Sequence, residues 1–180
     1  GCGGRGSGAA DQALNTNRIG PVKLVAVADA FEDRMQSSLN GLKNKHGDRV
    51  DVPEDRQFVG FDAYKKAIAA ADVVILATPP GFRPSHFAEA VKQGKHVFME
   101  KPVAVDGPGI RSVLASYQVA EDKGLCVAAG TQRRHQKPYI ETVARLQEGA
   151  IGDVMYIKAY WNGGAIWHRG DKGATPLEVQ

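Results

Sequence analysis

Gly1-Cys2-Gly3-Gly4-Arg5-Gly6 opens the chain with the spacing G-x-G-x-x-G. Glycines at this spacing allow a tight turn between a buried strand and a helix, where bare backbone and unpaired N–H groups can receive a pyrophosphate. The helix is predicted from Ser7 to about Leu14. No strand precedes the turn, so we expect an internal fragment that lacks its first strand. Two neighbouring strands would then be unpaired, which predicts poor independent folding.

The composition is that of an ordinary globular protein. The 180 residues are 43% hydrophobic and 24% charged, enough for one domain and part of a second. The formal net charge is +3 with both signs interspersed, which indicates neither nucleic acid nor an anionic membrane as a partner. Cys2 and Cys126 are far apart and outside any metal-binding pattern, so we expect two free thiols and no metal site.

No apolar run approaches the roughly 20 residues that span a bilayer. We expect a cytoplasmic protein. Export stays open because a signal peptide could precede Gly1.

Strand and helix patterns alternate along the chain, as in βαβ units that build a parallel sheet with helices on both faces. The strands are expected at 22–28, near Phe58, at 73–77, at 96–99 and at 125–129, making six with the missing first strand. The polar stretch 46–56 is expected to be a loop. The predicted fold class is therefore α/β, a doubly wound parallel sheet of the Rossmann type.

A second domain is predicted to follow. The boundary near residue 131 divides the chain into a dinucleotide-binding domain at 1–131 and the beginning of another domain at 132–180. A helix from Pro138 is expected to lead to a longer strand at 154–161, with aromatic residues on both faces.

Asp29 ends the second expected strand, 23 positions after Gly6 (29 minus 6). A carboxylate there can accept hydrogen bonds from both hydroxyls of the adenosine ribose, and the alternative role is a helix N-cap. At about 5 Å it would repel a 2′-phosphate by about 3 kcal/mol per unit charge at an effective dielectric of about 20. The sequence therefore favours NAD over NADP. Arg34 could pair with Asp29, lie over the adenine or bind a phosphate.

Glu100-Lys101-Pro102 directly follows the strand predicted at 96–99. In open α/β sheets, ligands bind outside the carboxyl ends of the strands. A lysine in that position can take part in proton transfer, and Glu100 could steady it or hold a ribose hydroxyl. The alternative is a solvated Glu-Lys pair at the end of a strand.

Three further groups have two interpretations each. His86, above the loop at 78–80, either faces a cofactor or is a surface histidine. Trp167-His168-Arg169 could line a sugar-sized pocket or pack a loop. Arg133-Arg134-His135 is a basic group at the domain junction, or pairs with a helix end or carboxylates.

In order, the segments GCGGRG, ATPPGFRPSH, GKHVFMEKP, AAGTQRR and GAIGDVMYIKAYW resemble the glucose-fructose oxidoreductase, inositol dehydrogenase and rhizopine-catabolism (Gfo/Idh/MocA) family. The similarity covers almost the whole chain, and GKHVFMEKP after the A-T-P-P loop and a helix is its most specific part. The resemblance implies an N-terminal Rossmann domain and a C-terminal α/β domain. The open antiparallel sheet of the latter supports substrate binding and oligomer contacts, so we expect a homo-oligomer.

The resemblance also implies an activity: hydride exchange between a nicotinamide cofactor and a secondary alcohol of a sugar or cyclitol. Lys101 matches the family's catalytic lysine, and its downstream Asp and His would lie beyond Gln180. Together, sequence and resemblance predict cofactor contacts at Gly1, Gly3, Gly4, Arg5, Gly6, Asp29, Arg34, Thr78, Pro79, Pro80, His86, Glu100 and Lys101. The alternatives are an NAD-dependent glycosidase that oxidises its substrate transiently, or a non-catalytic sugar- or dinucleotide-sensing protein of the same fold.

Overall fold

A computed structural model describes residues 1–16 and 20–163 of the chain. Its contacts divide the chain into two compact units, Gly1–Arg133 and Arg134–Gln180. Trp167, His168 and Arg169, suggested above as pocket residues, lie outside the described residues. Within the described ranges, no helix has the length and apolar character needed to cross a membrane.

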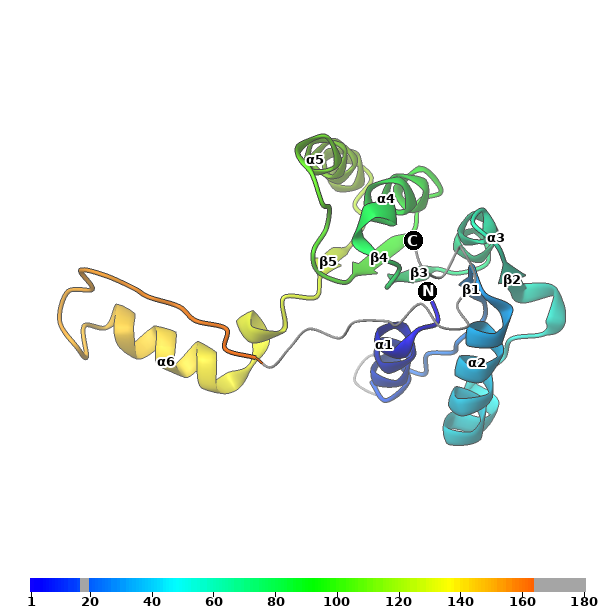
Figure 1. Cartoon of the computed structure of the whole chain (residues 1–180), viewed down its shortest axis with the longest axis horizontal. Helices are drawn as coiled ribbons and strands as arrows, with labels where there is room; N and C mark the ends of the chain where they lie inside the picture. The colour runs from blue at the N-terminus through cyan, green and yellow to red at the C-terminus, as the bar shows by residue number, and fades with distance from the viewer. Residues whose placement is uncertain (17–19, 164–180) are drawn as a thin grey trace. The chain divides into compact units, whose positions relative to one another are not determined.

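Helices and strands alternate through the first unit (Figure 1). Its helices are α1 (Gly4–Leu14), α2 (Glu32–His46), α3 (Ala63–Ala69), α4 (Arg83–Lys92) and α5 (Gly107–Asp122). Its strands are β1 (Val27–Asp29), β2 (Gln57–Val59), β3 (Val73–Leu76), β4 (His96–Met99) and β5 (Val127–Ala129). Short 3₁₀ turns occupy Gly47–Arg49, Glu54–Arg56, Pro80–Phe82 and Gln132–His135.

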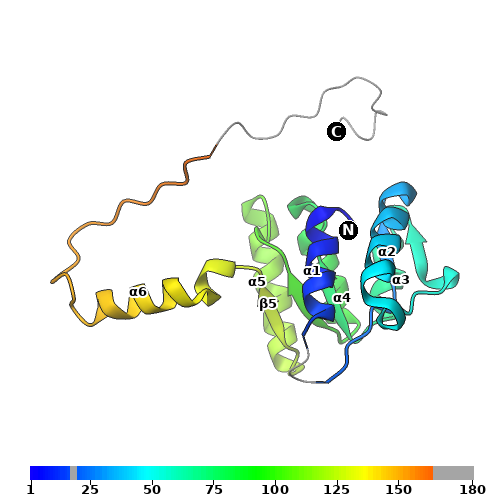
Figure 2. The same ribbon diagram turned by 90° about the horizontal axis from the view of Figure 1, so that it is seen from below.

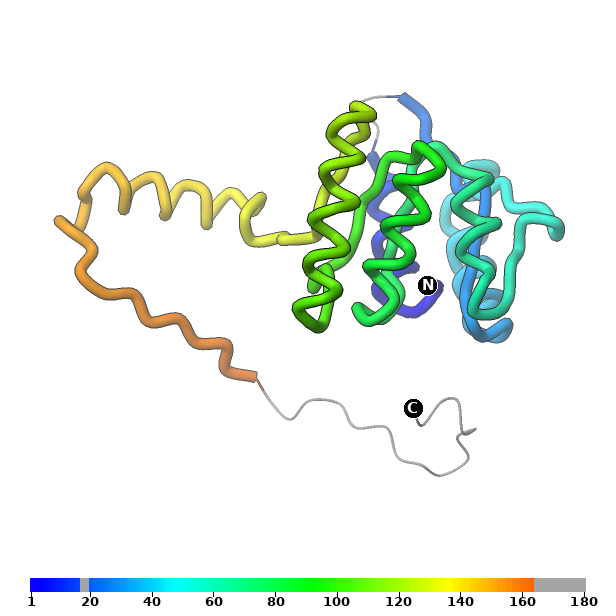
Figure 3. Tube along the Cα trace, turned by 90° about the horizontal axis from the view of Figure 1, so that it is seen from above, coloured from blue at the N-terminus to red at the C-terminus, as the bar shows by residue number. Residues whose placement is uncertain are grey.

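All paired strands of the described chain are parallel. β1 pairs with β2 in one sheet, and the order β3-β4-β5 forms another. Helices α3, α4 and α5 lie on one side of the strands and α1 and α2 on the other (Figures 1 and 3). This confirms the doubly wound α/β fold predicted from the sequence.

The chain begins between the two sheets. The Cys2 thiol donates to the Ala28 carbonyl of β1 at 3.4 Å. A Cβ on Gly1 would lie 3.0 Å from the backbone nitrogen of Thr78, just after β3. The break in strand pairing therefore falls between β1 and β3, and these are the two unpaired neighbours that the sequence predicts for a sheet without its first strand.

Two apolar clusters form the core of the first unit. The larger packs β3 and β4 against α4 and α5, and contains Ile68, Leu76, Phe87, Ala90, Val91, Val97, Met99, Val113 and Ala120. The smaller packs β1 against α1 and α2, and contains Leu14, Val27, Met35, Leu39, Leu42 and Val50. Each cluster fixes one part of the strand edge on which the candidate site is built.

Two expectations for the first unit are corrected. The strand predicted at 22–28 is shorter, because Leu24 forms only an isolated bridge with Val50 before β1 begins at Val27. The stretch 46–56 is not simply a loop. His46 completes α2, the two 3₁₀ turns follow, and buried Val50 joins the smaller core cluster.

The second unit contains one described helix, α6 (Lys137–Gln147), with Pro138 in its first turn. The strand predicted at 154–161 is not formed: these residues have no regular structure and are exposed, Met155 at 90%. No strand within the described part of the chain pairs with this segment, and a strand forms only where its backbone groups find a neighbouring ladder. The predicted antiparallel sheet stays a prediction.

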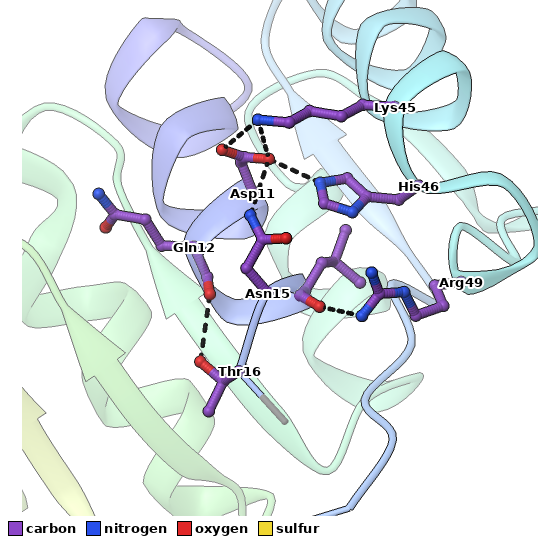
Figure 4. A network of polar contacts seen from close by, with 8 residues as sticks. Asp11, Gln12, Asn15, Thr16, Lys45, His46 and Arg49 are labelled. Carbon is purple, nitrogen blue, oxygen red and sulfur yellow. Dashed lines mark hydrogen bonds and ion pairs between the residues drawn. The ribbon is translucent and has the colours of Figure 1, made fainter. Parts of the chain in front are cut away.

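A polar cluster joins the ends of α1 and α2 that lie far from the glycine turn (Figures 2 and 4). The Asp11 carboxylate lies 2.8 Å from Lys45 Nζ and 2.6 Å from His46 Nε2. Hydrogen bonds from these two groups hold the pKa of Asp11 below its ordinary value. Arg49 donates to the Leu14 carbonyl at the end of α1. These contacts fix the direction of α1, whose opposite end carries the glycine turn.

Candidate functional site

The glycine turn leads directly into α1. Gly3 is the N-cap residue and provides no side-chain cap, so the N–H groups of the first turn have no partner within the helix. A Cβ on Gly3 or Gly4 would meet nothing within 4 Å, and both residues are exposed. Open space, unpaired donors and a positive helix end are what a pyrophosphate requires, so the turn fits a dinucleotide.

Asp29 holds the glycine turn in place. Its Oδ2 accepts a hydrogen bond from the backbone N–H of Cys2 at 2.6 Å, and its Oδ1 accepts one from Phe31 at 3.0 Å. Phe31 is the N-cap residue of α2, so Asp29 braces the start of that helix without being its N-cap. Carboxylate oxygens have further lone pairs, which leaves capacity for ribose hydroxyls.

Among the residues that the structure describes, Arg34 forms no ion pair with Asp29. Its guanidinium carbon lies 4.7 Å from the centre of the Phe31 ring, a cation–π arrangement on the first turns of α2. Arg34 is half-buried there and follows β1 by five positions, beside the predicted ribose position.

Glu100 connects the end of β4 to the glycine turn. Arg5 Nε donates to Glu100 Oε1 at 2.8 Å, although the two residues are 95 positions apart. The Glu100 side chain is only 10% exposed, whereas that of Arg5 is 50% exposed. A Cβ on Gly130 would lie 3.0 Å from Glu100 Oε2, so a glycine after β5 leaves room for the carboxylate.

His86 braces the turn that follows β3. Its Nδ1 lies 3.2 Å from Thr78 Oγ1, and its ring stacks on Tyr64 with centroids 3.9 Å apart. Only 6% of His86 is exposed, so the interpretation as a surface histidine is wrong. Burial lowers the pKa of His86 to about 4. The imidazole is therefore neutral at pH 7, and its Nδ1 can either donate a hydrogen bond to the threonine hydroxyl or accept one from it.

The depressed pKa predicts a dependence of stability on pH. The folded state takes up the His86 proton only near pH 4, whereas an unperturbed histidine takes it up at 6.5. The unfolded state thus binds more protons between these values, and about 3 kcal/mol of folding free energy is lost as the pH falls from 6.5 to 4. The free energy of unfolding of His86→Phe, measured with denaturant, should depend less on pH between 6.5 and 4 than that of wild type. The exposed-histidine control, His135→Phe, should keep the wild-type slope; equal slopes in all three proteins would contradict the prediction.

The structure brings most of the predicted residues to one edge of the strands. Thr78 follows β3, Glu100 and Lys101 follow β4, and Arg5 reaches across to Glu100 from α1. Lys101 is exposed at this edge. Of the remaining predicted residues, Pro79 and Pro80 form the turn and the 3₁₀ start before α4. The basic residues 133–135 are exposed and lie beyond β5 at the unit boundary.

Two contributors were not predicted from the sequence. Arg83, at the start of α4, donates to the backbone carbonyls of Thr78 and Glu100 from a buried position. Gly130 provides the space for the Glu100 carboxylate. No periodic sequence pattern indicates that an arginine is buried. The role of Gly130 depends on Glu100, a neighbour 30 residues away in the sequence (130 minus 100).

Comparison with known proteins agrees with this fold. Residues 1–131 match the model of the Gfo/Idh/MocA family, described as an oxidoreductase family with an NAD-binding Rossmann fold. A scyllo-inositol 2-dehydrogenase (NAD(+)) of Bacillus subtilis is 27% identical over 158 residues, covering 87% of this chain and 39% of that protein. A scyllo-inositol 2-dehydrogenase (NADP(+)) of the same organism is 27% identical over 96 residues, covering 52% and 25%.

Among solved structures, scyllo-inositol dehydrogenase from Lactobacillus casei with bound NAD(H) and scyllo-inositol superposes with a TM-score of 0.61 at 25% identity. The match covers 81% of this chain and 39% of that one. The chain thus spans about two fifths of the length of these two relatives. Because the family match extends over residues 1–131 and the fold agrees, the chain belongs to the Gfo/Idh/MocA oxidoreductase family.

Proposed function

We propose that the protein transfers a hydride between a nicotinamide dinucleotide, preferably NAD, and a secondary alcohol of a cyclitol or sugar. The observation that carries the proposal is the convergence of the glycine turn, the Thr78 turn and Glu100-Lys101 at one strand edge. The hydrogen bond of 2.8 Å between Arg5 and Glu100 joins the first and last of these. The cyclitol class is supported by the similarity of the chain to scyllo-inositol dehydrogenases.

Each part of the site has a distinct task in this proposal. The glycine turn and the first turn of α1 bind the pyrophosphate, and Asp29 receives the adenosine ribose. The bound nicotinamide supplies the redox chemistry by accepting or giving a hydride. Lys101 accepts the proton of the substrate hydroxyl as its carbinol hydrogen leaves, and returns it in the reverse direction. Thr78 and Glu100 flank this position and orient the reacting groups.

Calorimetric titration of the intact protein with NAD and NADH tests binding, and the absorbance of reduced nicotinamide with myo- or scyllo-inositol tests turnover. We expect binding together with accumulation of NADH. A glycosidase that oxidises only transiently would release the sugar without accumulating NADH. A sensing protein would bind without turnover. The absence of heat with either form of the cofactor would contradict both enzyme functions and dinucleotide sensing.

Asp29 should determine the preference of the site for NAD over NADP. Replacing it by asparagine removes the negative charge that repels a 2′-phosphate, at a similar volume. The ratio of the NADP dissociation constant to the NAD dissociation constant should fall by more than about tenfold in Asp29→Asn. The ratio is informative because any loosening of the Cys2 and Phe31 contacts affects both dinucleotides alike.

Two further variants complete this measurement. Asp33→Asn removes an exposed carboxylate from the same helix start, and the ratio should stay at the wild-type value. Adding Arg34→Met to Asp29→Asn should raise the ratio again if Arg34 is able to bind the 2′-phosphate. An unchanged ratio in Asp29→Asn would remove the carboxylate from cofactor selection.

A further inference from the structure

Arg83 is the largest of the fully buried side chains in the described chain, with 2% of its surface exposed. It is the first residue of α4. Its two terminal nitrogens donate to different carbonyls, Nη1 to that of Glu100 and Nη2 to that of Thr78. Its Nε is buried without a hydrogen-bond partner in the described residues. The guanidinium thus reaches the turns after both β3 and β4.

Packing alone does not explain an arginine in this place. Burying a guanidinium costs free energy through loss of hydration, and here an unpaired Nε adds to the cost. An unbranched apolar side chain such as methionine would fill a comparable space without this cost. Replacing buried charged groups by well-packed apolar residues is often neutral or stabilising. The two directed hydrogen bonds are what only a forked, planar donor can provide.

These bonds fix the residues that the proposed site needs. Thr78 carries the hydroxyl bound to His86, and Glu100 is both the partner of Arg5 and the direct neighbour of Lys101. The two turns follow adjacent strands in register, Leu76 opposite Met99. A link between their carbonyls therefore sets the spacing between the Thr78 turn and the Glu100-Lys101 turn.

We propose that Arg83 is a positioning residue, which holds the turns after β3 and β4 at the separation required by the nicotinamide half of the dinucleotide. The inference rests on the proposed function, because that function places the nicotinamide half at these turns. The adenosine half lies with the glycine turn and Asp29, and among the described residues Arg83 forms its hydrogen bonds with Thr78 and Glu100 instead. The loss of Arg83 should therefore affect the two halves of the ligand differently.

The test compares NAD with ADP, which reaches only the adenosine and pyrophosphate positions. In the intact protein, Arg83→Met should weaken NAD binding about tenfold, the effect of losing a charged hydrogen bond, while ADP binding changes by less than about twofold. Turnover should fall as well: kcat should decrease by a larger factor than the KM of the cyclitol substrate increases. Arg83→Lys keeps the charge and one directed bond, so it should restore part of the NAD affinity.

Arg49 offers a matched control, because it also donates to a backbone carbonyl, that of Leu14 at the far end of α1. Arg49→Met should leave the ratio of NAD to ADP affinity at the wild-type value. Equal losses of NAD and ADP affinity in Arg83→Met, or no loss of either, would overturn the inference while leaving the proposed function intact. A wild-type protein that binds ADP but not NAD would overturn both.

If Arg83→Met does not fold, Arg83→Lys provides the test of the inference. A selective loss of NAD affinity in the lysine variant, with a thermal midpoint near that of wild type, supports the inference. Full wild-type NAD affinity in that variant overturns it, because the ammonium cannot reproduce the fork that joins two carbonyls.

Discussion

Replacement of Lys101 by methionine should lower the turnover of the intact protein by about 10²- to 10⁴-fold, the range for loss of a general acid–base group. NAD affinity should stay within about twofold of wild type. The reason is positional: Lys101 is exposed and follows β4, so the glycine turn, Asp29 and the core clusters do not depend on it. Steady-state rates and calorimetric NAD titration measure the two quantities.

Lys95 provides the matched control at the other end of the same strand. It precedes β4, and its Nζ donates to the Ala69 carbonyl at 3.3 Å. Lys95→Met removes an identical side chain far along the strand from the candidate site, and turnover should be unchanged. Wild-type turnover in Lys101→Met would exclude the lysine from proton transfer. Equal losses of NAD affinity and turnover would assign it to binding instead.

The elements that sequence predicted well are those with strong local signals. β4 has the predicted bounds, His96–Met99, because a short apolar run is closed on both sides by polar residues. The ends of α4 and α5 follow from Gly94 and Gly124, whose φ values of 71° and 66° suit glycine. A local pattern is sufficient when the residue itself determines the backbone conformation.

The errors concern elements whose existence depends on a partner. The apolar residues at 22–26 read as strand, but a ladder also needs a neighbour, and only the pair Leu24–Val50 is formed before β1. The segment 154–161, predicted as a strand with aromatic residues on both faces, likewise lacks a paired strand within the described chain. A run of apolar residues indicates that a segment tends to be buried. Strand formation also requires the edge of a neighbouring strand that can form hydrogen bonds with it.

In the candidate site, too, residues with a local sequence pattern were predicted, whereas contacts between distant residues were not. Gly1, Gly3, Gly6 and Asp29 were identified as a group because they follow a fixed spacing, although their role as a dinucleotide site stays a prediction. The contact of Arg5 with Glu100 spans 95 positions and has no signature in sequence. Arg83 was overlooked because arginine is usually exposed, and only the fold reveals the two carbonyls that satisfy it. Sequence therefore indicates the residues with a spacing typical of ligand contacts more readily than the residues that position them.

Replacement of Gly6 by alanine should abolish measurable dinucleotide binding. Gly6 is buried in the first turns of α1, and a Cβ there would lie 1.8 Å from the Gly1 carbonyl oxygen and 3.5 Å from the Ala77 Cβ. Both the helix and the carbonyl belong to the backbone, so no side-chain rotation can relieve the overlap. Either α1 or the glycine turn must shift, and the N–H donors proposed to receive the pyrophosphate shift with it.

Gly8→Ala is the matched control in the same helix, because a Cβ on Gly8 would meet nothing within 4 Å. An alanine within a helix is favoured over glycine by about 1 kcal/mol, so this variant should unfold at a higher denaturant concentration and bind NAD as wild type does. Gly6→Ala should unfold earlier and bind neither NAD nor ADP. Since the overlap lies at the proposed pyrophosphate position, its effect should differ from that of Arg83→Met, which should spare ADP. A Gly6→Ala protein with wild-type ADP affinity would show that the glycine turn does not bind the pyrophosphate.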